Sequence, residues 1–185
     1  QQYFSLSSFG PYSSSFDDTS VHQTSFYGSL LFNALNKKLN IEIGGRVNKH
    51  SRYGTNSTYT FNPSYNISEN WRVFASIASG FKAPSIFQVY DAFSGNPDLK
   101  AKKSTNYEIG VQQLHEKISS RIVYFHRDIK NGIDYNNATF KYFNFVKQAV
   151  SGLELELSLR AIEKLDISAN YTLITGDEQT QSRKS

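Results

Sequence analysis

SGLELELSLR, the run from Ser151 to Arg160, places a leucine at every second position, and polar or charged residues such as Glu154 and Glu156 lie between the leucines. On a helix this order would scatter leucines and charges around the whole surface. On a strand it separates them onto opposite faces. The period of two therefore predicts a β-strand with one apolar and one polar face.

The alternation recurs along the chain and predicts eight antiparallel strands, although the first and sixth alternate less cleanly than the others. Most of them span about 11 residues, the length that a tilted strand needs to cross a bilayer. Strands of soluble proteins are commonly about half as long. The predicted strands cover residues 24–35, 39–49, 57–67, 71–81, 104–115, 118–130, 147–160 and 164–174.

The connections between these strands alternate between short and long. Short turns are predicted around residues 36–38, 68–70, 116–117 and 161–163, and longer loops at residues 50–56, 82–103 and 131–146. In an antiparallel meander every second connection lies on the same side, so the long loops share one side. Outer-membrane barrels have this asymmetry. We therefore expect an all-β fold, an antiparallel transmembrane β-barrel.

Composition agrees with a barrel whose outside is apolar and whose inside is polar. Only 38% of the 185 residues are hydrophobic, yet 15% are aromatic, and no run of about 18 apolar residues could form a membrane-spanning helix. The net charge of +4 is small and scattered, which argues against nucleic acid as a partner. The absence of cysteine rules out disulfides and thiolate chemistry.

Catalytic chemistry has little support in the sequence. No serine lies in a nucleophile-elbow pattern, and no acidic cluster has the ligand spacing of a calcium loop. Glu154 and Glu156 alternate with leucines, as in a polar lumen wall. We expect no catalytic residue, no metal site, no cofactor and no enzyme activity. The four histidines are spread over different predicted elements: His22, His50, His115 and His126.

Several motifs in order resemble those of TonB-dependent outer-membrane receptors. They are GFKAPS (80–85), GNPDLK (95–100), YEIGV (107–111), IDY (133–135), KYFN (141–144), SGLELEL (151–157) and ANYTLITG (169–176). The run from IDY to SGLELEL is most similar to the cobalamin (vitamin B12) receptors, although siderophore receptors share most of these elements. The chain departs from the family's usual LKPEKS, since it has LKAKKS at 99–104.

The resemblance implies a 22-stranded barrel with an N-terminal plug, in the outer membrane of a Gram-negative bacterium. Residues 1–185 would then be a partial barrel domain, with the plug and the terminal strands absent from it. The implied function is uptake of a large scarce nutrient, cobalamin or a siderophore–iron chelate. The implied partners are outer-membrane lipid, that nutrient, and the energy-coupling protein TonB, which acts through the plug.

The predicted long loops combine aromatic and amide side chains, which suit a bulky, partly polar ligand such as a corrinoid or chelated iron. An interfacial aromatic belt explains Tyr90, Tyr135 and Tyr142 equally well, and it is the favoured role of Trp71. The predicted ligand-binding residues are Phe87, Tyr90, Asn96, Asp98, Asp134, Tyr135, Asn136, Tyr142 and Asn144.

Two other protein classes fit the alternation. One is a complete small eight-stranded outer-membrane barrel, an adhesin or structural protein, in which the first and eighth strands pair. The other is a soluble, lipocalin-like binding barrel with its leucines turned inward.

Overall fold

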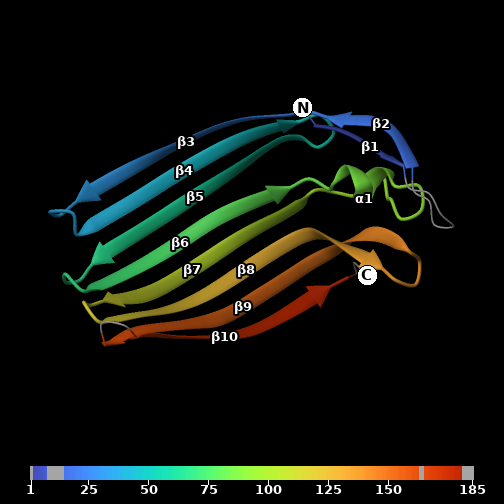
Figure 1. Cartoon of the computed structure of the whole chain (residues 1–185). Coiled ribbons are helices and arrows are strands. Elements are labelled where there is room, and N and C mark those ends of the chain that lie inside the picture. Colours follow the sequence, from blue (N-terminus) through green and yellow to red (C-terminus); the bar gives the residue numbers. More distant parts are fainter. Residues whose placement is uncertain (1, 8–14, 163–164, 181–185) are drawn as a thin grey trace, which may run out of the picture.

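The computed structural model describes residues 2–7, 15–162 and 165–180, and side chains from residues 20–160 and 165–180. Its main element is one antiparallel sheet of eight strands, in which every strand pairs with its neighbours in sequence (Figure 1). The strands are β3 (Gln23–Ala34), β4 (Leu39–His50), β5 (Gly54–Asn66), β6 (Trp71–Lys82), β7 (Lys102–Leu114), β8 (Ile118–Asn136), β9 (Lys141–Ile162) and β10 (Leu165–Gln179).

All eight predicted strands are therefore confirmed, and so is the all-β antiparallel fold. The described sheet is open, with β3 at one edge and β10 at the other (Figure 1). A complete eight-stranded barrel needs these two strands to pair. The described part of the chain has no such pairing, so the small closed barrel is disfavoured.

The face that carries the leucines of β9 is apolar across the whole sheet. Ile109 pairs with Tyr124, Tyr124 with Leu153, and Leu153 with Leu173, so one apolar rung runs over four strands. These side chains are not packed against a protein interior, since Ile109 is 62% exposed. Leu157 on the same face is 50% exposed. We call this the outer face.

The opposite, inner face is polar and carries side-chain ladders between strands. Asn62 donates to Glu42 at 3.1 Å and accepts from Ser76 at 2.7 Å, which links β4, β5 and β6. Arg121 of β8 forms an ion pair of 3.0 Å with Glu156 of β9. Glu156 therefore lies on the polar face, opposite the neighbouring leucines, as the alternation predicts.

The connections β3–β4, β5–β6 and β7–β8 lie at one end of the sheet, and the long segment 83–101 lies at the other end (Figure 1). Two predicted long loops are wrong. Residues 50–56 are mostly strand, because β4 and β5 continue to a turn at 51–53. Residues 131–146 form a hairpin whose turn is 137–140, with Asn136 paired to Lys141.

This hairpin extension has a local physical cause. Gly132 lies opposite Phe145, and the ring of Phe145 fills the space that a Cβ on Gly132 would occupy. The Asn136 Oδ1 accepts the backbone N–H groups of Ala138 and Thr139, at 2.8 and 3.1 Å, and so closes the turn. The pairing of β8 with β9 therefore continues past the membrane-crossing length.

Two small elements complete the described structure. A hairpin of β1 (Gln2–Ser7) and β2 (Ser15–Val21) lies in the N-terminal segment, for which no strand was predicted. The other is the short helix α1 (Ile86–Tyr90), which follows Pro84 and begins with a capping box between Ser85 and Gln88. In the described residues, no helix is long and apolar enough to cross a membrane.

Candidate functional site

The segment 83–101 is fixed to the extension of β9 by backbone and amide hydrogen bonds. Tyr142 donates its backbone N–H to the carbonyl of Ser94 at 3.0 Å, and its own carbonyl accepts from Asn96 Nδ2 at 2.8 Å. Asn144 accepts from the Lys100 N–H at 2.7 Å and donates to the Lys100 carbonyl at 3.0 Å. Residues 94–100 of the loop are therefore hydrogen-bonded along β9 at Tyr142 and Asn144.

The turn between β4 and β5 holds the other side of the same segment. Arg52 donates from Nη1 to the Tyr90 hydroxyl at 2.7 Å and from Nη2 to the carbonyl of Pro97. Its guanidinium also lies over the Tyr90 ring, 5.2 Å from the centroid. Burial raises the pKa of the neighbouring Tyr53 hydroxyl above its usual value. Arg52 thus connects two loops that are 38 residues apart in sequence.

Aromatic rings gather where these segments meet. Phe87 of α1 makes an edge contact with Tyr142 at 6.3 Å between centroids, and Tyr135 meets the same ring at 5.1 Å. Phe93 and Phe140 form a second pair at 5.8 Å. The structure therefore brings three predicted ligand residues, from α1, β8 and β9, into one cluster.

The other predicted ligand residues have varied surroundings. Tyr90, Asn96 and Asn144 make the loop contacts above, and Asp98 is exposed. Asp134 accepts the N–H of Tyr135 at 2.7 Å, and Asn136 closes the hairpin turn. Several of these side chains thus shape the loops directly, and their contact with a ligand remains a prediction.

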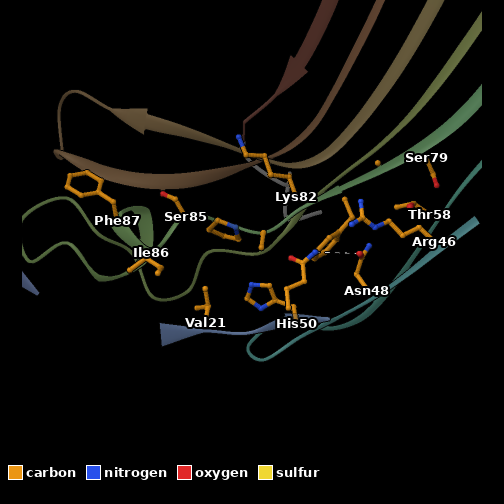
Figure 2. A pocket seen from close by; sticks show the side chains of 15 residues that line it. Val21, Arg46, Asn48, His50, Thr58, Ser79, Lys82, Ser85, Ile86 and Phe87 are labelled. Carbon is orange, nitrogen blue, oxygen red and sulfur yellow. Dashed lines mark hydrogen bonds between the residues drawn. The ribbon is translucent and has the colours of Figure 1, made fainter. Parts of the chain in front are cut away.

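A pocket of about 840 Å³ opens on the inner face beside the start of this loop (Figure 2). Its size lies within the range of small-molecule sites. It is lined by the outer ends of β4, β5 and β6, by Val21 at the end of β2, by the start of β3, and by residues 83–87. Phe87 joins this pocket to the aromatic cluster.

The pocket lining is cationic. Arg46 and Lys82 contribute two basic side chains, and no carboxylate occurs among the described residues that line it. Buried Asn48 accepts from Ser25 Oγ at 2.6 Å. It also accepts from Gln23 Nε2 at 3.4 Å, and this second bond is the one dashed in Figure 2. These hydrogen bonds fix the amide beside the cations. The arrangement suits a bulky ligand with negative charge.

His50 is the last residue of β4 and lines this pocket. It lies beyond the apolar band of the outer face, which on β4 ends at Val47. Its Nδ1 accepts the backbone N–H groups of Arg52 at 3.1 Å and Tyr53 at 3.4 Å, so the ring must be neutral at that nitrogen. Burial lowers the pKa of His50 below its usual 6.5. The turn that carries Arg52 therefore depends on an uncharged His50.

Sequence reasoning missed the pocket residues. Arg46 and Asn48 stand on the polar face of the predicted strand 39–49, so the alternation could have placed them in the lumen. Lys82 and Gln23 lie at strand ends, and only the register shows that they face the same space. A search limited to loops could not find them.

A family model described as "TonB dependent receptor-like, beta-barrel" matches residues 1–184. Solved structures are also similar. The siderophore receptor PirA from Pseudomonas aeruginosa shares 24% identity at a TM-score of 0.76, over 94% of this chain and 39% of that one. A ferric enterobactin receptor (PfeA) mutant from Pseudomonas aeruginosa shares 24% identity at a TM-score of 0.72, and the match covers 85% of this chain and 27% of that one.

The copper transporter OprC shares 14% identity at a TM-score of 0.72, over 87% of this chain and 29% of that one. At these identities the structural similarity establishes the fold alone. The chain spans between 27% and 39% of the length of these three structures.

Proposed function

Because this chain belongs to the TonB-dependent receptor β-barrel family, we propose that it forms wall and external loops of a receptor that takes up a negatively charged metal chelate. The chain is a segment of an outer-membrane β-barrel. The observation that carries the proposal is the cationic pocket between Arg46 and Lys82.

Electrostatics favours a chelate over a neutral nutrient at this position. Iron chelates with several catecholate or carboxylate groups carry net negative charge, and a guanidinium binds such oxygens in bidentate fashion. The low dielectric of a recessed pocket strengthens that attraction. The similarity to a siderophore receptor and a ferric enterobactin receptor supports the same class of cargo.

The aromatic cluster has a complementary role in this proposal. Phe87, Tyr135 and Tyr142 offer flat apolar faces close to the pocket entrance, while Asn96 and Asn144 hold the backbone that presents them. A ligand with aromatic chelating groups would contact the rings first and then reach the cations. Energy for transport would come from TonB acting through a plug domain.

Cobalamin is the second candidate, on the similarity of residues 133–157 to the cobalamin receptors. A corrinoid also suits an aromatic entrance, but it lacks the multiple negative charges that Arg46 and Lys82 would neutralise. The two nutrients therefore predict different dependence on these two residues.

The test is binding by the intact purified receptor, with Arg46→Ala/Lys82→Ala as the variant. We expect the variant to bind an anionic ferric tris-catecholate about tenfold to a hundredfold more weakly than wild type, because two charge-assisted contacts are removed. Lys37→Ala/Lys117→Ala, in turns at the other end of the sheet, is the matched control and should bind as wild type. Growth of a deletion strain on limiting iron or limiting cobalamin gives the cellular result. Tight cobalamin binding with no binding of the chelate would contradict the proposal.

A further inference from the structure

Three polar side chains of β4 follow one another along one side of the inner-face pocket (Figure 2). Arg46, Asn48 and His50 occupy alternate positions of the strand, so they share its inner face at intervals of about 6.7 Å. Lys82, from β6, lines the same pocket two strands away. A bound ligand would therefore meet polar groups of β4 over a length of about 13 Å.

Asn48 has its carbonyl oxygen occupied and its amide nitrogen open to the pocket. Oδ1 accepts from Ser25 Oγ and Gln23 Nε2, which fixes the orientation of the amide. Nδ2 has no acceptor among the described residues, although Asn48 is only 5% exposed. It is not one of the sealed buried atoms without a partner, which are Tyr53 Oη and Asp91 Oδ1. Nδ2 therefore reaches the open space of the pocket as a donor.

His50 offers a donor to the pocket in the same way. Its Nδ1 accepts two backbone N–H groups of the turn at 51–53, so the proton of the neutral ring must lie on Nε2. Nε2 lies on the side of the ring away from that nitrogen and has no acceptor among the described residues. His50 is 6% exposed and lines the pocket. The turn therefore selects the tautomer that leaves an N–H group for a ligand.

Side-chain acceptors are scarce in the same pocket. Its described lining includes no carboxylate, and Gln23 Oε1 is the one side-chain carbonyl oxygen there without a hydrogen bond. The hydroxyl oxygens of Ser79 and Ser85 already accept backbone N–H groups, from Tyr59 at 2.8 Å and from Gln88 at 3.2 Å. Each hydroxyl keeps its hydrogen for donation. A ligand in this pocket therefore meets mainly donors.

A site of donors distinguishes the two states of a chelating group. A catechol without metal carries O–H groups, and each of them needs an acceptor. Metal binding displaces these protons, and the oxygens become negatively charged acceptors. The donors of the pocket then pair with metal-bound oxygens, whereas the metal-free form leaves its O–H groups and some of the donors unpaired. Unpaired polar groups of this kind give strong discrimination.

We propose that Asn48 and His50 are specificity-determining residues, which donate to metal-bound oxygen atoms and so make the pocket select the metal-loaded chelate over the metal-free chelator. This inference rests on the proposed function, because it concerns the same pocket. Arg46 and Lys82 attract the charge of the chelate. Asn48 and neutral His50 carry no charge, so their contribution is separable from that attraction.

The test measures the affinity of the intact purified receptor for a tris-catecholate chelator, in its ferric and in its metal-free form, by isothermal titration calorimetry. We expect wild type to bind the ferric form at least about a hundredfold more tightly, because several charge-assisted hydrogen bonds form only with deprotonated oxygens. Equal affinity for the two forms would overturn the inference.

Two substitutions separate the nitrogens of the His50 ring. His50→Asn keeps an acceptor near the position of Nδ1 but has no donor at the position of Nε2, so it should bind the ferric form about tenfold more weakly. Its affinity for the metal-free form should stay within about twofold of wild type. His50→Gln is the matched control, because its amide reaches the position of Nε2. It should bind the ferric form within about threefold of wild type, while the amides of the turn at 51–53 exchange faster.

Asn48→Asp gives the second measurement, which also serves if His50→Asn does not fold. It keeps Oδ1 for Ser25 and Gln23 and replaces the donor Nδ2 by an oxygen. Affinity for the ferric form should fall at least about tenfold, with no loss for the metal-free form. Heat-dependent gel mobility verifies that each variant folds.

Wild-type affinity for the ferric form in the folded variants His50→Asn and Asn48→Asp would overturn the inference. If Arg46→Ala/Lys82→Ala still weakens binding in that case, the proposed function stands and only the role of the uncharged donors is wrong. Absence of ferric chelate binding to wild type would overturn both.

Discussion

The middle of β9, residues 153–157, and its outer end, residues 141–146, belong to one strand but are stabilised differently. In the middle, the side chains alternate between lipid and lumen, and the register follows from that alternation. At the outer end, single contacts determine the structure, such as Phe145 over Gly132 and Asn144 against Lys100. A substitution in the middle should therefore change stability, whereas one at the outer end should change the loops.

The largest effect is expected on the lipid face. Leu155→Arg should destabilise the folded receptor by about 2–4 kcal/mol, because the charge would face the hydrocarbon near the middle of the band. Glu154→Gln, one residue away on the inner face, should stay within about 0.5 kcal/mol of wild type. Urea unfolding in detergent or lipid vesicles measures both. Equal losses at the two positions would show that the faces are not distinct.

The second effect tests close packing across the inner face. A Cβ on Gly152 would overlap the ring of Phe125 and would stand 2.5 Å from the carbonyl oxygen of Leu173. Gly152→Ala should therefore cost about 1–3 kcal/mol, since backbone must move. Gly45→Ala is the control, because no atom lies within 4 Å of the place where its Cβ would stand. Alanine there should raise the free energy of unfolding by about 0.5 kcal/mol. The same unfolding assay applies, and a harmless Gly152→Ala would contradict the packing.

The third effect belongs to the loop end alone. Arg52→Ala removes the contacts to Tyr90 and Pro97, worth about 1 kcal/mol at an exposed site. Amide hydrogen exchange of residues 86–98 should accelerate about fivefold, while exchange within β7 and β8 stays unchanged. Lys117→Ala, at the opposite end, should leave both unchanged. Faster exchange throughout the sheet would mean that Arg52 supports the wall as well.

The smallest effect is a pH dependence of the turn at 51–53. The folded state lowers the pKa of His50 below 6.5, so it binds the proton less readily than the unfolded state does. The contribution of neutral His50 to the free energy of unfolding is fully present above pH 6.5, and it is lost as the pH falls through the pKa of His50 in the folded state. His50→Asn keeps an acceptor that does not titrate. Exchange of the turn amides should rise on acidification in wild type more than in this variant, and parallel pH profiles would contradict the assignment.

The membrane-crossing part of the strands could be predicted because apolar side chains there face one side of the sheet and polar side chains face the other, and this alternation is visible in the local sequence. Leu153, Leu155 and Leu157 alternate with Glu154 and Glu156, and no distant residue is needed to interpret that order. The short helix at 86–90 also depends on neighbouring residues, since Ser85 and Gln88 form its capping box.

The loop end was less predictable because its structure depends on contacts between distant segments. Asn131 and Gly132 are typical turn residues, yet they lie inside β8, since Phe145 fills the space at the glycine. The contact of Arg52 with Tyr90 joins residues that no local pattern connects. Likewise, the pocket cations Arg46 and Lys82 come from strands whose register was not available from the sequence.

The most direct test of the two-faced wall uses single introduced cysteines, since residues 1–185 contain none of their own. Spin labels are attached to single cysteines introduced at each position from 153 to 158 of the intact receptor in vesicles, and their collision with oxygen and with a water-soluble nickel chelate is measured. We predict that oxygen access peaks at 153, 155 and 157 and that nickel access peaks at 154, 156 and 158, two oscillations of period two in opposite phase. Oscillations in the same phase, in the reversed phase, or with a period of 3.6 would contradict a barrel wall with leucines in lipid.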